Sequence, residues 1–185
     1  MLSDDWYVLK KTTFDYRRAD GRWQTMSRET YDRGNGVTVL PVDAAARTVL
    51  LIRQFRYPAY VNGWEGGMLI ETCAGIPDGL PAEEAIRKEV AEEIGCRIGE
   101  PRKVFELFMS PGSVTERVTF FIAEYDSRET GRWRGGLEEE GEDIEVLEVG
   151  FEEAWRMVEE GEIVDGKTVI LLQHLRLMDG FPGEV

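Results

Sequence analysis

The chain has 185 residues, which is enough for one domain or for a small domain joined to a larger one. Its formal net charge is −14 at pH 7, which disfavours nucleic acid backbones and anionic membranes as partners. No apolar run reaches the roughly 18 residues that a membrane-spanning helix needs, and the acidic first five residues lack the basic and apolar regions of a signal peptide.

The chain contains two cysteines, Cys73 and Cys96, which are too few for a disulfide framework. We therefore expect both thiols to be reduced and the protein to be cytoplasmic. A polyanionic substrate would need metal ions or a local group of arginines to offset the negative charge. The acidic composition is also typical of a protein whose surface charge only keeps it in solution.

An N-terminal β-unit is predicted over residues 1–35. Alternating apolar and polar residues predict two strands, and the dipeptide Asp20-Gly21 between them is a strong signal for a hairpin turn. The turn-forming residues 32–36 predict a junction. The two predicted strands cover residues 6–16 and 22–31.

A larger domain is expected over residues 36–185. Its strands and helices do not alternate regularly, which favours an α+β fold or an α/β sandwich over a doubly wound sheet. The predicted strands are 36–41, 48–55, 68–73, 104–108, 118–125 and 144–149. The predicted helices are 82–94, 151–160 and 166–177. Loops are expected at 62–67, 74–81, 110–116 and 127–143, the last of them acidic and mobile.

Three glutamates stand close together in the second half of the helix predicted over residues 82–94. Glu89 and Glu93 are four residues apart, and Glu92 is three residues from Glu89, so an α-helix places these carboxylates on one face. Like charges at these spacings destabilise a helix by a few tenths of a kcal/mol. A divalent cation would compensate, because Mg²⁺ prefers oxygen ligands and also bridges phosphates. The alternative is a solvated acidic face.

Residues 87–95, Arg-Lys-Glu-Val-Ala-Glu-Glu-Ile-Gly, resemble the second half of the Nudix box, whose pattern is Arg-Glu-apolar-x-Glu-Glu-x-Gly. Lys88 stands where arginine is usual, and Gly75 resembles the opening glycine of the box. The sequence departs from the box in two ways. The spacing from Gly75 to Glu89 is one residue short, and the glutamate of the first half is missing, with Pro81 near its place.

Other segments resemble the nucleotide-sugar pyrophosphatases within the Nudix superfamily. The Ile-Arg-Gln-Phe-Arg strand at 52–56 and the Ser-Pro-Gly loop at 110–112 carry this resemblance. The Asp-Gly-Lys-Thr segment at 165–168 favours the GDP-mannose hydrolase branch, which is close to the ADP-ribose pyrophosphatases. The resemblance implies an α/β/α sandwich with a mixed sheet, joined to a small N-terminal antiparallel β-unit.

The implied activity is hydrolysis of the pyrophosphate bond of a nucleoside diphosphate sugar with Mg²⁺, or with Mn²⁺ as the alternative metal. GDP-mannose, giving GMP and mannose 1-phosphate, is the first candidate substrate. ADP-ribose, giving AMP and ribose 5-phosphate, is the second. A non-catalytic domain that only senses a nucleotide is a third hypothesis. The intact set Glu89, Glu92 and Glu93 argues against it, because a binding module has no need of a metal cluster.

The resemblance implies metal ligands and residues that handle water. The backbone carbonyl of Ala74 and the carboxylates of Glu89 and Glu93 would hold the metal, and Glu142 would be a further ligand. Glu92 would assist through water. Glu116 would orient or deprotonate the catalytic water. The alternatives are an exposed loop acid for Glu116 and a charged loop for Glu142.

Substrate contacts are implied at two cations in particular. The planar fork of Arg56 suits a diphosphate, although a surface salt bridge is the alternative. Lys167 would act as a point charge. The full implied set is Trp6, Ser27, Arg28, Glu29, Arg56, Ala74, Gly75, Ile76, Glu93, Glu116, Gly141, Glu142 and Lys167.

The N-terminal β-unit resembles one that is exchanged between the subunits of a homodimer. Trp6 and the Ser27-Arg28-Glu29 segment would then cover the nucleotide base in the partner's site, with Trp6 and Arg28 stacking on it. Core or interface packing is the alternative for Trp6. The single histidine, His174, lies in an apolar helix and is predicted to be structural, so a histidine-dependent nucleophile has little support.

Overall fold

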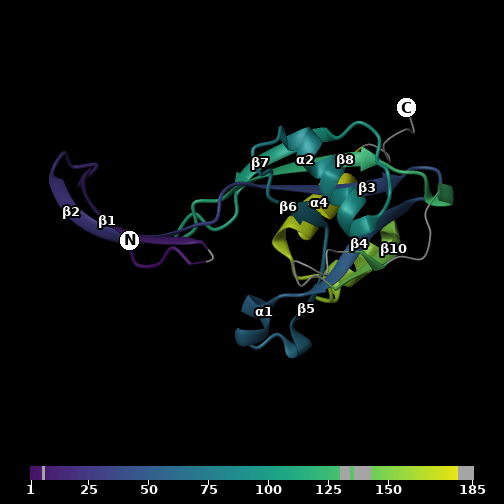
Figure 1. The fold of residues 1–185 in the computed structure, drawn as a ribbon, viewed down its shortest axis with the longest axis horizontal. Coiled ribbons are helices and arrows are strands. Elements are labelled where there is room, and N and C mark those ends of the chain that lie inside the picture. Colours follow the sequence, from purple (N-terminus) through teal and green to yellow (C-terminus); the bar gives the residue numbers. More distant parts are fainter. Residues whose placement is uncertain (6, 130–133, 136–142, 179–185) are drawn as a thin grey trace.

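The computed structural model describes residues 1–5, 7–129, 134–135 and 143–178. A hairpin of β1 and β2 forms one sheet, and eight further strands form a second (Figure 1). The strands are β1 (Val8–Arg17), β2 (Trp23–Asp32), β3 (Gly36–Asp43), β4 (Thr48–Phe55), β5 (Met68–Glu71), β6 (Cys73–Gly75), β7 (Arg102–Phe108), β8 (Arg117–Glu124), β9 (Arg134–Gly135) and β10 (Ile144–Gly150). The helices are α1 (Tyr57–Val61), α2 (Ala82–Glu89), α3 (Phe151–Glu159) and α4 (Gly166–Leu177), with single turns η1 (Glu65–Gly67), η2 (Val90–Ile94) and η3 (Ser127–Glu129).

The large sheet is mixed, as predicted. Its order is β7-β8-β3-β4-β10-β9, with β5 paired to β4 and β6 paired to β3. β3 and β8 run parallel, whereas every other pair in the sheet is antiparallel. In the described part of the chain, no helix is long and apolar enough to cross a membrane.

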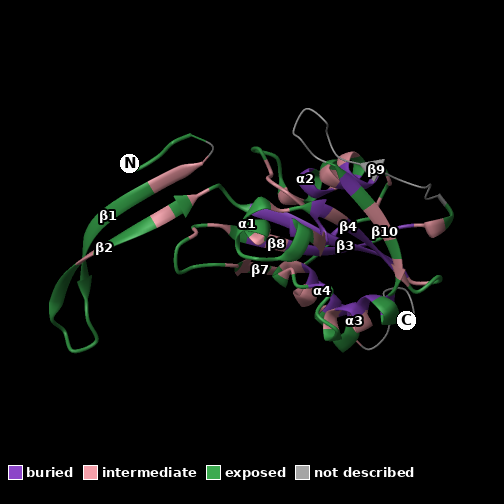
Figure 2. Ribbon diagram, turned by 90° about the horizontal axis from the view of Figure 1, so that it is seen from below, coloured by how far each residue is buried: buried purple, intermediate pink, exposed green. Residues whose placement is uncertain are grey.

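Both faces of the central strands are buried, which explains why their sequences are almost continuously apolar. Successive side chains of a strand point to opposite faces. On β3, Val37 and Val39 therefore join one core, while Leu40 and Val42 join the other. Helix α2 and turn η2 cover the first face, and α3 and α4 cover the second. This arrangement confirms the predicted α/β/α sandwich (Figure 2).

The segment after η1 differs from the prediction. A single strand was expected over residues 68–73 with a loop from Ala74, but the structure has two strands that break at Thr72. β5 pairs with β4, whereas β6 pairs with β3 and places Ala74 opposite Thr38. The backbone N–H of Thr72 donates instead to the side chain of Thr168, at 2.7 Å. A distant helix therefore fixes the point where the chain changes partners, so local sequence did not reveal it.

The helix predicted over residues 82–94 has the expected bounds but not a uniform geometry. It is α-helical to Glu89 and then widens into the π-turn η2. Gly95 ends it with a positive φ of 73°, and its N–H donates to the carbonyl of Val90 at 3.0 Å. The π-turn changes which glutamates share a face, because it adds residues to the last turn.

Three further segments complete the comparison with the predicted elements. The helix α1 begins after β4, with a proline in its first turn, and was not predicted. Within the acidic loop predicted over 127–143, η3 and β9 are ordered elements, and β9 pairs with β10. The predicted hairpin is confirmed, with its turn at Gly21 (φ 84°).

The hairpin of β1 and β2 extends away from the large sheet and exposes most of its residues (Figures 1 and 2). Its base is attached to the loop before β8. The N–H of Tyr31 donates to the carbonyl of Ser113 at 2.8 Å, and the N–H of Thr115 donates to the carbonyl of Tyr31 at 3.1 Å. The side chain of Thr115 also donates to Asp32, at 3.0 Å.

Candidate functional site

The carboxylate of Glu89 lies directly against the backbone of Gly75. A Cβ atom at position 75 would stand 2.1 Å from Cδ and 2.2 Å from Oε1 of Glu89, which is far inside van der Waals contact. The opening glycine therefore serves a steric purpose, because any side chain there would displace this carboxylate. The structure brings together Gly75, its neighbour Ala74 and Glu89, three of the predicted site residues.

Glu116 reaches the same place from the loop before β8. A Cβ atom at Gly36 would lie 3.2 Å from Oε1 of Glu116 and 3.6 Å from the carbonyl oxygen of Gly75. Glu116 also forms an ion pair with Arg33, at 3.4 Å, and its side chain is 16% exposed. Glu116 is therefore a largely buried acid beside the strand that carries Ala74, and not a solvated loop residue.

Glu93 lies on the inner side of the π-turn and is 4% exposed. It is close to the fully buried Cys73, where burial first, and then the charges of Glu93 and Glu89, raise the pKa of the thiol well above its ordinary value. Cys73 precedes Ala74 on β6, so Glu93 and Glu89 both face this strand. The thiol is therefore neutral at physiological pH, which suits a structural role.

Glu92 does not join this group. Its carboxylate lies 3.4 Å from Lys88, and both side chains are partly exposed. The charge of Glu92 and its hydrogen bond raise the pKa of Lys88 above the ordinary value. A regular α-helix would have placed Glu92 on the face of Glu89, but the chain widens into the π-turn at this point.

Arg56 was predicted to end a strand, but in the structure it is the first residue after β4. Its Nε lies 3.0 Å and its Nη2 2.7 Å from the carboxylate of Glu71, a fork-on-fork ion pair with an acid that is 2% exposed. Burial lowers the pKa of Arg56, but Glu71, Glu93 and Asp165 together raise it above the ordinary value. Arg56 therefore lies within the field of Glu93.

Lys167 begins α4, as predicted, and its ammonium group is 2.7 Å from Asp165. Ile76 is half-buried after β6. Ser27, Arg28 and Glu29 lie in the middle of β2, on the exposed hairpin that extends away from the large sheet (Figures 1 and 2). Within one chain, the structure therefore does not bring these three residues to Glu89. Three predicted residues lie outside the described part of the chain: Trp6, Gly141 and Glu142.

The donor atoms at β6 fit a hard divalent cation in their chemistry. The carboxylates of Glu89 and Glu93 and the backbone carbonyl of Ala74 are oxygen donors of the kind that Mg²⁺ prefers. Among the described residues, no three His, Cys, Asp or Glu side chains lie close enough together to hold a metal ion. Beyond these two carboxylates, a cation held by the described residues would therefore depend on the backbone carbonyl and on water.

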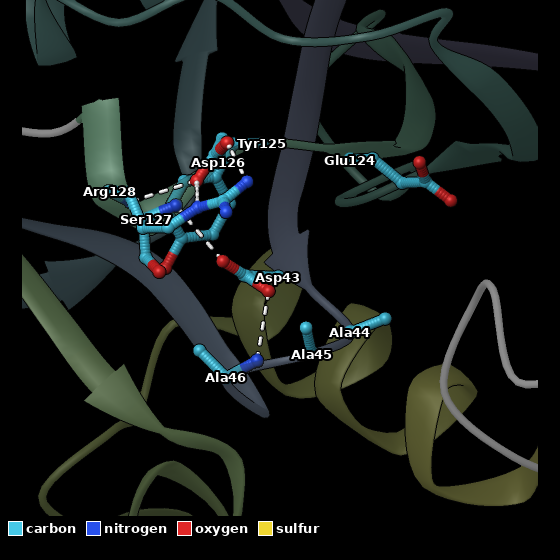
Figure 3. Close-up of a pocket in the computed structure, with 9 residues that line it drawn as sticks. All are labelled: Asp43, Ala44, Ala45, Ala46, Glu124, Tyr125, Asp126, Ser127 and Arg128. Atoms are coloured by element: carbon cyan, nitrogen blue, oxygen red, sulfur yellow. Dashed lines mark hydrogen bonds and ion pairs between the residues drawn. The ribbon is translucent and has the colours of Figure 1, made fainter.

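A pocket of about 500 Å³ lies at a different place, where the β3–β4 turn meets the end of β8 (Figure 3). Asp43 borders it and accepts hydrogen bonds from the N–H groups of Ala46 and Ser127, at 2.9 Å each. Of the predicted site residues that the structure describes, none lines this pocket. The ring of His174 packs edge-on against Phe105, with the two ring centroids 5.0 Å apart, and burial lowers the pKa of His174. Both features are expected of a structural residue.

Sequence reasoning missed three charged residues that contact the predicted set. Arg33 pairs with Glu116, Glu71 with Arg56, and Asp165 with Lys167. Ion-pair partners that lie far apart in the chain leave no local pattern. Asp165 alone had a local signal, because an aspartate directly before a predicted helix is typical of an N-cap.

Two family models match this chain. Residues 1–31 match the family model described as "GDP-mannose pyrophosphatase NudK N-terminal domain", and residues 32–172 match the model described as "NUDIX domain". A protein named GDP-mannose pyrophosphatase from Klebsiella pneumoniae subsp. pneumoniae is 54% identical over 97% of this chain and 91% of its own length. Proteins with the same name from Escherichia coli O157:H7 and Shigella dysenteriae serotype 1 are each 52% identical over 96% of this chain and 92% of theirs.

Replacing Gly75 by alanine should weaken divalent-cation binding while leaving the fold intact. The new Cβ would displace the carboxylate of Glu89, which is the end of a flexible side chain and can move without disturbing the backbone. We expect the dissociation constant for Mn²⁺, measured by electron paramagnetic resonance of the free ion, to rise by about tenfold or more. Gly150→Ala is the matched control, since a Cβ there meets nothing within 4 Å. Equal Mn²⁺ affinity in both variants would contradict the role of Gly75.

Proposed function

Because the chain belongs to the NUDIX domain family, we propose that it hydrolyses the pyrophosphate bond of a nucleoside diphosphate sugar. The proposed substrate is GDP-mannose. Water is added across the P–O–P linkage, so that GMP and mannose 1-phosphate are released. The observation that carries the proposal is the contact between the Glu89 carboxylate and Gly75, beside Glu116. The relatives named GDP-mannose pyrophosphatase, which match nearly the whole chain, support the choice of substrate.

The proposed cofactor is Mg²⁺, with Mn²⁺ as the alternative. The carbonyl of Ala74 and the carboxylates of Glu89 and Glu93 would hold it, and Glu142 is the proposed further ligand. When bound, such a cation offsets phosphate charge and makes a coordinated water easier to deprotonate. The position of Glu93 supports this assignment, because its carboxylate is buried beside Cys73, the residue that precedes Ala74 on β6.

The remaining roles belong to side chains around β6. We assign binding of the diphosphate to Arg56 and Lys167, whose cationic groups are held by buried or largely buried acids. To Glu116 we assign the orientation of the attacking water and the acceptance of its proton, which its largely buried position beside β6 supports. Glu92, paired with Lys88 at the edge of this group, assists through water. Gly75, Ile76 and the segment with Gly141 complete the proposed substrate contacts.

The proposed assembly is a homodimer in which residues 1–35 of each chain cover the site of the other. The exposed hairpin supports it, since Ser27, Arg28 and Glu29 stand apart from Glu89 of their own chain. In this arrangement Trp6 and Arg28 lie over the base of the nucleotide. The boundary between the two family models, at residues 31 and 32, agrees with a separate N-terminal unit. We place the protein in the cytoplasm, where the thiols of Cys73 and Cys96 stay reduced.

A panel of nucleoside diphosphate sugars with Mg²⁺ tests the substrate assignment directly. We expect kcat/KM for GDP-mannose to exceed that for ADP-ribose by about tenfold or more, which corresponds to ~1.4 kcal/mol of differential transition-state binding. Mass spectrometry of the products should identify GMP and mannose 1-phosphate. Preference for ADP-ribose would replace the substrate but keep the chemistry. No turnover of any member would favour a nucleotide-sensing domain instead.

Changing Glu93 to glutamine should lower kcat by at least about 100-fold, because the amide lacks the negative charge needed to hold the cation. The variant should stay folded, as urea unfolding will check, because glutamine has nearly the same shape and volume as glutamate. Glu84→Gln on the exposed side of the same helix is the matched control and should keep wild-type kcat. Wild-type kcat in Glu93→Gln would remove the metal role of this helix.

Mixed dimers test the exchange of the hairpin. Arg28→Ala and Glu93→Gln should each be nearly inactive alone. When the two chains are co-expressed and heterodimers are isolated, one composite site combines an intact Arg28 with an intact Glu93, so about half of the wild-type kcat should return. Without exchange, both sites of the heterodimer carry a defect and no activity returns. A monomer by light scattering would also contradict the proposal.

A further inference from the structure

Three threonines form a polar chain inside an otherwise apolar core. Thr38, Thr72 and Thr168 are each 0% exposed. The hydroxyl of Thr38 donates to the carbonyl of Cys73 at 2.9 Å, and the hydroxyls of Thr38 and Thr72 are 2.8 Å apart. The N–H of Thr72 donates to Oγ1 of Thr168 at 2.7 Å. Buried polar groups are retained only when they are hydrogen-bonded, and this chain of bonds satisfies each hydroxyl.

Asp165 is the charged end of this chain. Its Oδ2 accepts the hydroxyl of Thr168 at 2.8 Å and the N–H of Thr168 at 3.0 Å. Its Oδ1 accepts the ammonium group of Lys167 at 2.7 Å. The side chains of Asp165 and Lys167 are 11% and 21% exposed, so this pair is better shielded from solvent than an ordinary surface ion pair. Each oxygen of Asp165 therefore has a separate task.

The threonine chain ends at the strand segment that carries the candidate site. Thr72 separates Glu71, which holds Arg56, from Cys73 and Ala74 on β6. The charge of Asp165 also contributes to the raised pKa of Arg56, so Asp165 lies near both cations. Asp165 thus contacts Lys167 through one oxygen. Through the other oxygen it is linked to the segment that contains Ala74 and the acid paired with Arg56.

We propose that Asp165 is a positioning residue that holds Lys167 toward the diphosphate of the substrate and, through Thr168 and Thr72, fixes the segment containing Ala74. This inference rests on the proposed function, because Lys167 is assigned to the diphosphate there. The simpler explanation is that Asp165 only caps α4, whose N-cap it occupies. Asparagine and serine cap helices about as well as aspartate, so substitution can separate the two explanations.

Asp165→Asn is the informative variant. Its amide oxygen can still accept the N–H and hydroxyl of Thr168, but the amide nitrogen that replaces Oδ1 repels the ammonium of Lys167. We expect the dissociation constant for GDP, measured by titration calorimetry with Mg²⁺, to rise about tenfold. KM for GDP-mannose should rise by a similar factor, with kcat within about twofold of wild type. The melting temperature should stay near that of the wild type.

A double-mutant cycle with Lys167→Met shows whether Asp165 acts through Lys167. If it does, Asp165→Asn should add little to the GDP affinity already lost in Lys167→Met. The matched control is Glu106→Gln, which neutralises an acid 2.6 Å from Lys103 on the edge strand β7 and should leave GDP affinity and KM unchanged. Asp165→Ser is the second variant, because serine keeps the cap but cannot reach Lys167 with a charge.

Several other outcomes overturn the inference. Unchanged GDP affinity in Asp165→Asn, or losses that multiply in the double variant, would mean that Asp165 does not hold Lys167 for the ligand. Unfolding of both Asp165→Asn and Asp165→Ser would assign the carboxylate to stability. Absence of GDP binding by the wild type would overturn it as well. A wild-type protein that binds GDP but hydrolyses no nucleotide sugar would instead contradict the proposed function. In that case the double-mutant cycle measured by calorimetry would still decide the role of Asp165.

Discussion

The close approach of strand β6 to the carboxylate of Glu89 is the constraint on which the candidate site depends. Gly75 has no side chain, so the carboxylate of Glu89 can lie directly against the backbone of the strand that also carries Ala74. The strand reaches this position because the chain changes partner at Thr72, from β4 to β3. Two neighbouring features of this segment therefore set the distance between its backbone and the helix: the missing side chain of Gly75, and the bond of Thr72 to Thr168 on the distant helix α4.

Charge is organised locally, although the chain carries a net charge of −14. Acids at the site have cations beside them: Glu116 with Arg33, Glu71 with Arg56, and Asp165 with Lys167. Such pairs hold cations in place in an environment whose overall field repels anions. In the proposed function, Arg56 and Lys167 are the positioned positive groups that a diphosphate would meet, even though the long-range field is unfavourable. The partly buried ion pairs would then serve recognition.

Much of the architecture could be predicted from sequence, because local patterns specify it. The hairpin turn at Gly21, the apolar central strands and the NUDIX family were all inferred correctly from residue spacing and motifs. The break at Thr72 was not, because it depends on a tertiary contact with Thr168. The π-turn after Glu89 was not either, because hydrophobic periodicity does not separate a π-turn from an α-helix. The same limit explains the partners of the predicted residues. Glu93 was assigned from the motif, whereas Glu71 became visible only through its contact with Arg56.

The hairpin poses an energetic problem that the large sheet does not. An isolated two-stranded hairpin is marginally stable in water, and this one exposes Trp23 by 69% and Tyr16 by 50%. Its attachment at the base, between Tyr31 and the loop before β8, orients it without burying these rings. That loop carries Glu116, and Arg33 at the end of the hairpin pairs with it. Covering the hairpin by a second chain would therefore stabilise β1 and β2 and, through Arg33, restrict Glu116, so that assembly and catalytic geometry become coupled.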